Sequence, residues 1–167
     1  MKILNFGSIN IDLVYRVPHI VRPGETLSSS SISTFAGGKG NNQSIALARA
    51  GAPVFHAGKI GTDGQWIVRN LKSAGANVRF VRKDREPTGH AIIQVADGGQ
   101  NSIVLFPGAN RTITKREIME TIAHFNGGDI LLLQNEVNAI PAMMKAAHKS
   151  GLKIWFNPAP FDSSIIN

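Results

Sequence analysis

The chain has 167 residues, 43% of them hydrophobic, which is enough for one domain with a buried core. It has no cysteine, which excludes disulfides and thiolate metal sites, and its formal charge of +7 is spread along the chain, which argues against a nucleic-acid partner. Because no apolar run approaches the roughly 20 residues that span a bilayer and the chain opens on a strand-like run instead of a signal peptide, we expect a cytoplasmic protein without a membrane partner.

The first predicted element is a short buried strand from Lys2 to Phe6, followed by the sequence Gly-Ser-Ile-Asn-Ile-Asp. Asn10 and Asp12 stand two residues apart in this sequence, so on extended backbone their side chains point the same way. A carboxylate accepts hydrogen bonds and an amide both donates and accepts, so the pair can hold neighbouring hydroxyls of a polyol. Alternatively, both side chains only satisfy the backbone of a turn.

Two thin, partly exposed strands are predicted next, over residues 13–17 and 27–35, and a glycine-rich turn follows them. The turn, from Phe35 to Gln43, contains three glycines, Lys39 and three amide side chains, and it leads into a helix over 43–50. Glycines allow a ligand to approach the backbone, and the first turn of a helix has unpaired N–H groups. The composition therefore predicts a binding loop for a small polar or anionic ligand.

Two nucleotide-binding motifs do not fit this turn. A Walker A loop requires Ser or Thr directly after Gly-Lys, whereas Gly40 follows Lys39 here. A dinucleotide-binding fingerprint would follow the first strand directly, where this chain has Gly7 and Ser8 instead.

The rest of the chain alternates between strands and helices. Strands are predicted over 54–60, 78–81, 91–95, 102–106, 129–133 and 153–156. Helices are predicted from Trp66 to near Gly75, from Thr114 through Ile122 and from Pro141 to Lys149. Asp63 is expected to cap the first of these helices, and Thr114 with Glu117 has the spacing of a capping box. The sequence Asp-Gly-Gly-Gln at 97–100 indicates a hairpin between two strands.

Strands separated by helices predict an α/β fold with a mostly parallel sheet flanked by helices. Ligand sites in such folds lie at the carboxyl ends of the strands. Asn10 and Asp12 come just after one predicted strand and Glu136 just after another, so we expect these side chains to share a site. The basic cluster at 79–85 is interrupted by acidic residues and fits an ordinary solvated surface.

The motifs, in this order and spacing, resemble the ribokinase, or PfkB, family of carbohydrate kinases over essentially the whole chain. The resemblance is carried by residues 7–12, 23–26, 37–43, 61–63, 88–89, 107–110, 134–136 and 157–160. It implies a ribokinase-like fold with a small β-sheet lid, whose strands would come from residues near 13–35 and 88–106.

The resemblance also implies transfer of the γ-phosphoryl group of ATP to a hydroxyl of a pentose such as ribose, with ATP, Mg²⁺ and a monovalent cation as cofactors. The substrate-binding residues that it implies are Asn10, Asp12, Gly37, Gly38, Lys39, Asn42 and Glu136. The sugar is expected as the small-molecule partner. Because two lids pack together in the family, a second copy of the chain is expected as the protein partner. Deoxyribose, other pentoses, nucleosides and phosphosugars remain alternative substrates.

This sequence departs from the family pattern after residue 160, because the later motifs for Mg²⁺, the catalytic aspartate, adenine and the monovalent cation are missing. We therefore expect residues 1–167 to form the N-terminal, sugar-binding half of the fold, with no ATP turnover by this chain alone. A parallel sheet that stops here would leave an open edge and an uncovered apolar face. The alternatives are a non-catalytic sugar-binding or regulatory module and, more distantly, a nucleic-acid-binding protein.

Overall fold

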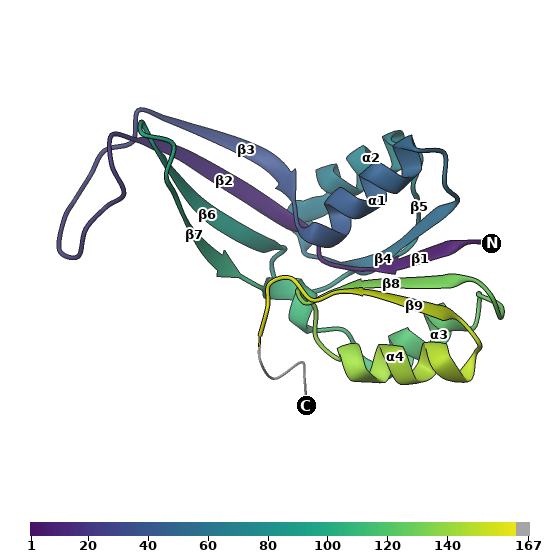
Figure 1. Ribbon diagram of the computed structural model, residues 1–167. Coiled ribbons are helices and arrows are strands. Elements are labelled where there is room, and N and C mark those ends of the chain that lie inside the picture. The colour runs from purple at the N-terminus through teal and green to yellow at the C-terminus, as the bar shows by residue number, and fades with distance from the viewer. Residues whose placement is uncertain (163–167) are drawn as a thin grey trace.

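The computed structural model describes residues 1–162, and its centre is a five-stranded main sheet in which every neighbouring pair of strands is parallel. Its strand order is β5-β4-β1-β8-β9 (Figure 1). The strands are β1 (Ile3–Phe6), β4 (Val54–Ile60), β5 (Asn77–Lys83), β8 (Ile130–Gln134) and β9 (Lys153–Asn157). The predicted parallel α/β architecture is confirmed.

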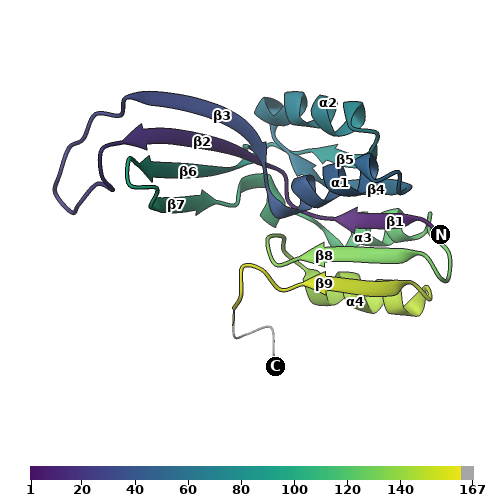
Figure 2. The same ribbon diagram turned by 45° about the horizontal axis from the view of Figure 1, so that its top comes forward.

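Two helices cover each face of the main sheet, as Figures 1 and 2 show. The helices α1 (Lys39–Arg49) and α2 (Gln65–Ser73) lie on one face, and α3 (Lys115–Ile122) and α4 (Ile140–Lys149) lie on the other. Side chains alternate between the two faces along a strand. Ile3 of β1 therefore packs into the core beneath α1 and α2, whereas Leu4 packs into the core above α3 and α4.

A second, smaller sheet projects from the main sheet, and we call it the outer sheet (Figure 2). Its strands are β2 (Asn10–Val17), β3 (Ser31–Gly37), β6 (Gly89–Ala96) and β7 (Asn101–Phe106), in the order β3-β2-β6-β7. The central pair β2 and β6 is parallel, and the two outer pairs are antiparallel. No helix of the described chain lies on this sheet, and many of its apolar side chains are exposed.

The register of the outer sheet separates its two faces. Asp12 is opposite Phe35 on one side and Ala91 on the other, so these residues share the face that we call the inner face. Tyr15, in contrast, is opposite Ile32 and lies on the other face. Asn10 and Asp12, two residues apart, are therefore on the same face, as the sequence predicts.

Several element boundaries differ from the sequence-based prediction. Helix α1 begins at Lys39 instead of 43, because the glycine-rich turn is itself the first turn of the helix. Strand β2 begins at Asn10 and strand β3 at Ser31, so Asn10 and Asp12 lie within a strand of the outer sheet. Two short 3₁₀ helices, Thr62–Gly64 and Gly108–Arg111, were not predicted.

The two capping predictions have different outcomes. The prediction for Asp63 is wrong, because α2 has no side-chain cap and the Asp63 carboxylate instead accepts hydrogen bonds from the Thr88 N–H and hydroxyl (3.0 and 2.6 Å). The capping box of Thr114 and Glu117 is present, with both of its reciprocal hydrogen bonds.

One part of the main sheet has an uncovered apolar face. Trp155 of the edge strand β9 is 53% exposed, on the side of the sheet where α1 and α2 lie mainly over β1, β4 and β5. A hollow of about 250 Å³ lies beside it, lined by Ile3, Gln43, Ala46, Leu47, Leu132 and Trp155. Within residues 1–162, the open edge and the uncovered apolar face that the sequence predicted are therefore present. None of the helices in residues 1–162 combines the length and the apolar character that a membrane crossing would need.

Candidate functional site

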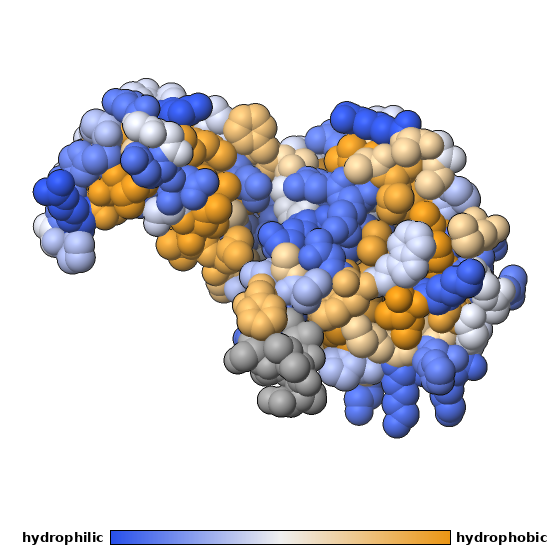
Figure 3. All heavy atoms as spheres, in the orientation of Figure 1, coloured by the Kyte–Doolittle hydropathy of each residue, from blue (hydrophilic) through white to orange (hydrophobic). Residues whose placement is uncertain are grey.

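The candidate site is a cavity of about 170 Å³ at the junction of the main and outer sheets. Figure 3 shows the surface hollowed between the two sheets, with apolar side chains on the outer-sheet side. The cavity is lined by Asn10, Asp12, Gly38, Lys39, Asn42, Ala91, Ile93, Ile103, Leu105 and Glu136. The structure thus brings together six of the seven predicted site residues. Gly37, the seventh, does not line the cavity.

Glycine at position 37 makes room for the Asp12 carboxylate. Gly37 ends strand β3 beside the start of β2, and a Cβ atom placed on it would overlap the carboxylate of Asp12. Gly38 follows with φ 90°, a left-handed conformation that favours glycine, and it turns the chain into α1. The two glycines therefore allow the first turn of α1 and the start of β2 to approach each other.

The carboxylate of Glu136 holds the glycine-rich turn in place. One oxygen accepts hydrogen bonds from the Ser8 hydroxyl (2.5 Å) and the Lys39 backbone N–H (2.8 Å), and the other lies 3.3 Å from Lys39 Nζ. The Ser8 hydroxyl also accepts a hydrogen bond from the backbone N–H of Gly40 (3.2 Å). Glu136, which follows β8, thereby links the end of the main sheet to the first turn of α1.

Asp12 is the carboxylate that remains available to a ligand. Burial raises its pKa above the ordinary value, the negative charge of Glu136 raises it further, and Lys39 opposes both effects. A partly desolvated carboxylate accepts stronger hydrogen bonds than a solvated one. The cavity therefore combines a carboxylate acceptor, an ammonium donor and two amides with an apolar wall.

Sequence reasoning missed several residues of this site. Ala91, Ile93, Ile103 and Leu105 of the inner face form the apolar wall, and the period-two pattern of their strands was the available signal. An adjoining cavity of about 210 Å³ shares Asn10, Leu105 and Glu136 with the first. It is also lined by Phe106, Pro107, Asn110, Arg111, Asn135 and Pro160.

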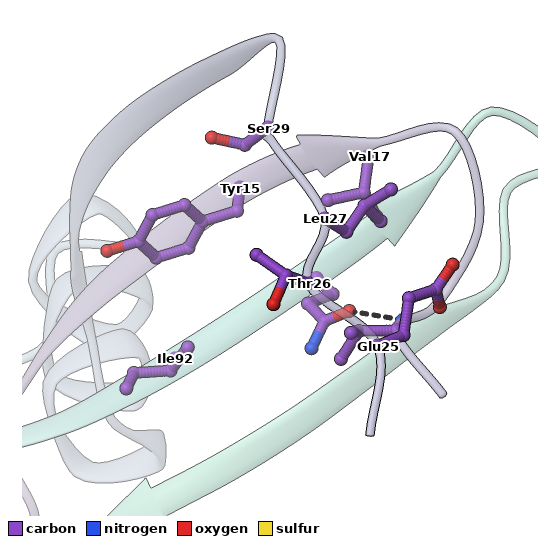
Figure 4. Close-up of a pocket in the computed structure, with 9 residues that line it drawn as sticks. Tyr15, Val17, Glu25, Thr26, Leu27, Ser29 and Ile92 are labelled. Carbon is purple, nitrogen blue, oxygen red and sulfur yellow. Dashed lines mark hydrogen bonds between the residues drawn. The ribbon is translucent and has the colours of Figure 1, made fainter. Parts of the chain in front are cut away.

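A larger cavity, of about 410 Å³, lies on the opposite face of the outer sheet beneath the loop between β2 and β3 (Figure 4). It is lined by Tyr15, Val17, Val21, Glu25, Thr26, Leu27, Ser29, Ile92 and Gln94. The Glu25 carboxylate is engaged by His19 Nε2 (2.8 Å) and by the Arg22 backbone N–H (2.9 Å), and Gln94 Oε1 accepts a hydrogen bond from the Val21 N–H (2.9 Å). These bonds secure the loop, and none of the predicted site residues lines this cavity.

The described residues do not fit Mg²⁺ or nucleotide phosphates. Within residues 1–162, no three His, Asp or Glu side chains are grouped so that they could hold a metal ion. Lys39 is paired with Glu136, and the position after it is Gly40 instead of a hydroxyl residue.

Comparison with known proteins places the chain in a family. Residues 1–165 match the model of the pfkB family carbohydrate kinases. The chain is 38% identical over 161 residues to the ribokinase of Haemophilus influenzae, covering 92% of this chain and 52% of that protein. The chain therefore belongs to the pfkB family of carbohydrate kinases, and it spans about half the length of the curated relatives it matches.

Two solved structures illustrate the similarity of the fold. Ribokinase from Cryptococcus neoformans in complex with ADP has a TM-score of 0.82 and 44% identity, covering 98% of this chain and 51% of that one. Ribokinase from Arabidopsis thaliana complexed with ribose and ATP has a TM-score of 0.81 and 31% identity, covering 95% of this chain and 53% of that one.

Proposed function

We propose that this chain is the sugar-binding half of an ATP-dependent kinase that phosphorylates a hydroxyl of a pentose, with ribose as the first choice. The observation that carries the proposal is that Asp12, Lys39 and Asn42, from different elements, line one small cavity. The family membership and the ribose and ATP held by the Arabidopsis thaliana relative agree with it. We place the protein in the cytoplasm, where ATP is available.

The role of each residue follows from its chemistry. The Asp12 carboxylate accepts hydrogen bonds from sugar hydroxyls, the ammonium of Lys39 donates to them, and the Asn10 and Asn42 amides complete the polar contacts. The backbone at Gly37 and Gly38 allows the sugar to come close. Glu136 lines the same cavity and holds the turn that carries Lys39.

The inner face of the outer sheet serves as a lid in this proposal. Ile93 and Leu105 line the cavity on the same face of the outer sheet as Asp12, where they would contact the C–H groups of the sugar. An apolar cover excludes water and strengthens the polar contacts beneath it. Phosphoryl transfer depends mainly on such positioning and on charge stabilisation around the transferred group.

The sugar-binding role is tested by titration calorimetry with ribose on the wild type and on Asp12→Ala. Loss of hydrogen bonds to a carboxylate costs about 1.5–3 kcal/mol, so we expect the affinity to fall by about 10- to 150-fold. The matched control is Asp97→Ala, which removes an exposed aspartate at the tip of the same outer sheet. Equal affinities of the wild type and Asp12→Ala would contradict the proposal.

The catalytic part of the proposal is tested by a coupled assay of ADP release. We expect the 167-residue chain alone to transfer no phosphoryl group, because its described residues provide no metal site. Turnover above background by the purified chain would contradict this expectation. If the complete product of the reading frame binds ribose but also transfers no phosphoryl group, a non-catalytic sugar-binding module is the better description.

We also propose that two copies associate through their outer sheets. The supporting observation is a set of exposed apolar side chains on these strands: Ile32, Phe35, Ile92, Ile103, Val104, Leu105 and Phe106. Exposed apolar patches and sheet edges of this kind mark association sites. Sedimentation velocity of the complete product should give a dimer, and a monomer at all concentrations would contradict this part of the proposal.

A further inference from the structure

The orientation of the Asn110 side chain is fixed by the backbone of Ile9. Asn110 is buried in the short helix Gly108–Arg111, and its Oδ1 accepts a hydrogen bond from the Ile9 N–H (3.0 Å). Its Nδ2 donates to the Ile9 carbonyl oxygen (3.2 Å). A backbone N–H can only donate and a carbonyl can only accept, so the two ends of the Asn110 amide cannot be exchanged.

This fixed amide in turn orients Asn10. The Nδ2 of Asn110 also donates to the Oδ1 of Asn10 (2.8 Å), which commits the oxygen of Asn10 to an acceptor role away from a ligand. Among the described residues no hydrogen bond uses the Nδ2 of Asn10, and this atom is not enclosed either. Asn10 lines both the candidate site and the adjoining cavity, so its free N–H group is available to a ligand bound there.

The strand beside Asn10 is adapted to this pair of amides. Gly89 of β6 is the partner of Asn10 in the central ladder of the outer sheet. A Cβ atom at Gly89 would overlap Asn110 Nδ2 and would lie 2.6 Å from Asn10 Oδ1. Only glycine leaves space for the two side chains to meet at this position.

We propose that Asn110 is a positioning residue that makes Asn10 a hydrogen-bond donor to the sugar. This inference rests on the proposed function and deepens it, because it assigns a direction to each contact. Asn10 binds the oxygen lone pair of one hydroxyl, whereas Asp12, which as a carboxylate can only accept, binds the hydrogen of a hydroxyl. The site therefore distinguishes sugars by the direction of their hydrogen bonds as well as by the positions of their hydroxyls.

The direction of these contacts can be measured with modified sugars. Fluorine accepts a weak hydrogen bond and donates none, so a deoxyfluoro sugar restores a contact to a donor but not one to an acceptor. Calorimetry on the complete product would compare the deoxy and deoxyfluoro forms of ribose at each non-anomeric hydroxyl. The hydroxyl bound by Asn10 is identified as the one whose removal from ribose weakens binding to the wild type but not to Asn10→Ala. The hydroxyl bound by Asp12 is identified with Asp12→Ala in the same way.

In the wild type, the deoxyfluoro sugar should bind more tightly than the deoxy sugar at the hydroxyl of Asn10, by about 2- to 10-fold for one hydrogen bond. At the hydroxyl of Asp12 we expect no such advantage, which makes this position the internal control. If the wild type binds ribose but binds the deoxyfluoro sugar no more tightly than the deoxy sugar at the hydroxyl of Asn10, the inference is overturned and the proposed function stands. Failure of the wild type to bind any of these sugars overturns both.

The role of Asn110 itself is tested with Asn110→Asp. A carboxylate cannot donate to Asn10, so the Asn10 amide should turn, present its oxygen to the cavity and lose the preference for fluorine. The matched control is Asn138→Asp, because the Asn138 side chain brackets the N–H and carbonyl of Ile113 in the same way (3.1 and 2.8 Å) but makes no hydrogen bond to Asn10 within the described residues. Persistence of the preference in folded Asn110→Asp overturns the positioning role. If this variant does not fold, the wild-type comparison of the two hydroxyls still decides the direction.

Discussion

The main sheet and the outer sheet use the same apolar residue types but differ in what covers them. Leu131 and Leu133 of the main sheet are 0% exposed beneath α3 and α4, whereas Val104 and Leu105 of the outer sheet are 64% and 52% exposed. The main sheet is therefore stabilised by packing within the chain. The apolar surface of the outer sheet is exposed within residues 1–162, and both proposals place their partners there.

The sharpest test of this comparison is the same substitution in each sheet. We expect Leu133→Ala to lower the free energy of unfolding by about 2–5 kcal/mol, because it leaves a cavity in the core. Leu105→Ala should cost less than about 1 kcal/mol in the monomer, because its side chain is half exposed. Urea unfolding monitored by circular dichroism measures both values. Similar losses of unfolding free energy in the two variants would contradict the difference between the sheets and would indicate that the outer sheet is covered in solution.

A pH titration tests the buried polar interior of the main sheet. His56 of β4 is fully buried, its Nδ1 lies 2.8 Å from the Ser44 hydroxyl, and burial lowers its pKa to about 4. The unfolded chain binds this proton at about 6.5, so between pH 6.5 and 4 the unfolded state holds more protons and the folded state loses stability as the pH falls. The full loss is about 3 kcal/mol.

The control for this titration is His56→Gln, which cannot take up the proton. The difference in unfolding free energy between the wild type and His56→Gln should change across this pH range, whereas the carboxylates contribute equally to both proteins. Parallel pH profiles would contradict a neutral, buried His56.

The junction between the two sheets is tested by Gly37→Ala. The added methyl group overlaps the Asp12 carboxylate and should displace it, lowering the binding free energy for ribose by about 1.5–3 kcal/mol, as much as Asp12→Ala does. Gly127→Ala is the matched control, because a Cβ there has only ordinary contacts and Gly127 precedes β8, whereas Glu136 of the cavity follows the other end of this strand. Calorimetry with ribose measures both, and unchanged affinity in Gly37→Ala would contradict the role of this glycine.

Elements with local signals could be predicted from the sequence. Strand β4 occupies the predicted residues 54–60, since it is a mostly apolar run, with His56 and Lys59 as its two polar residues, between Pro53 and Gly61. The capping box at Thr114 was also recognised, since both of its partners are near in sequence. The start of α1 was missed because Gly38 precedes it and provides no side-chain cap, so the usual signal is absent.

Features that depend on distant contacts could not be predicted from the residues alone. The true partner of Asp63 is Thr88, which is brought to it by the fold, so the local interpretation as a cap failed. In contrast, the placement of Asn10 and Asp12 on one face could be predicted, because side chains alternate between the two faces along a strand. Asn110 was visible only as part of a motif, since its role depends on a bond to Asn10 from far along the chain.

The outer sheet has one further consequence, for the order in which the protein is built. Its central ladder joins β2 to β6, pairing Asn10 with Gly89, so the two halves of this sheet are synthesised far apart in time. The first hairpin has no partner strand until the ribosome has released the second, and an isolated two-stranded ribbon is marginally stable at best. Neither hairpin is thus a transferable module, and deletion of one would disorder the other.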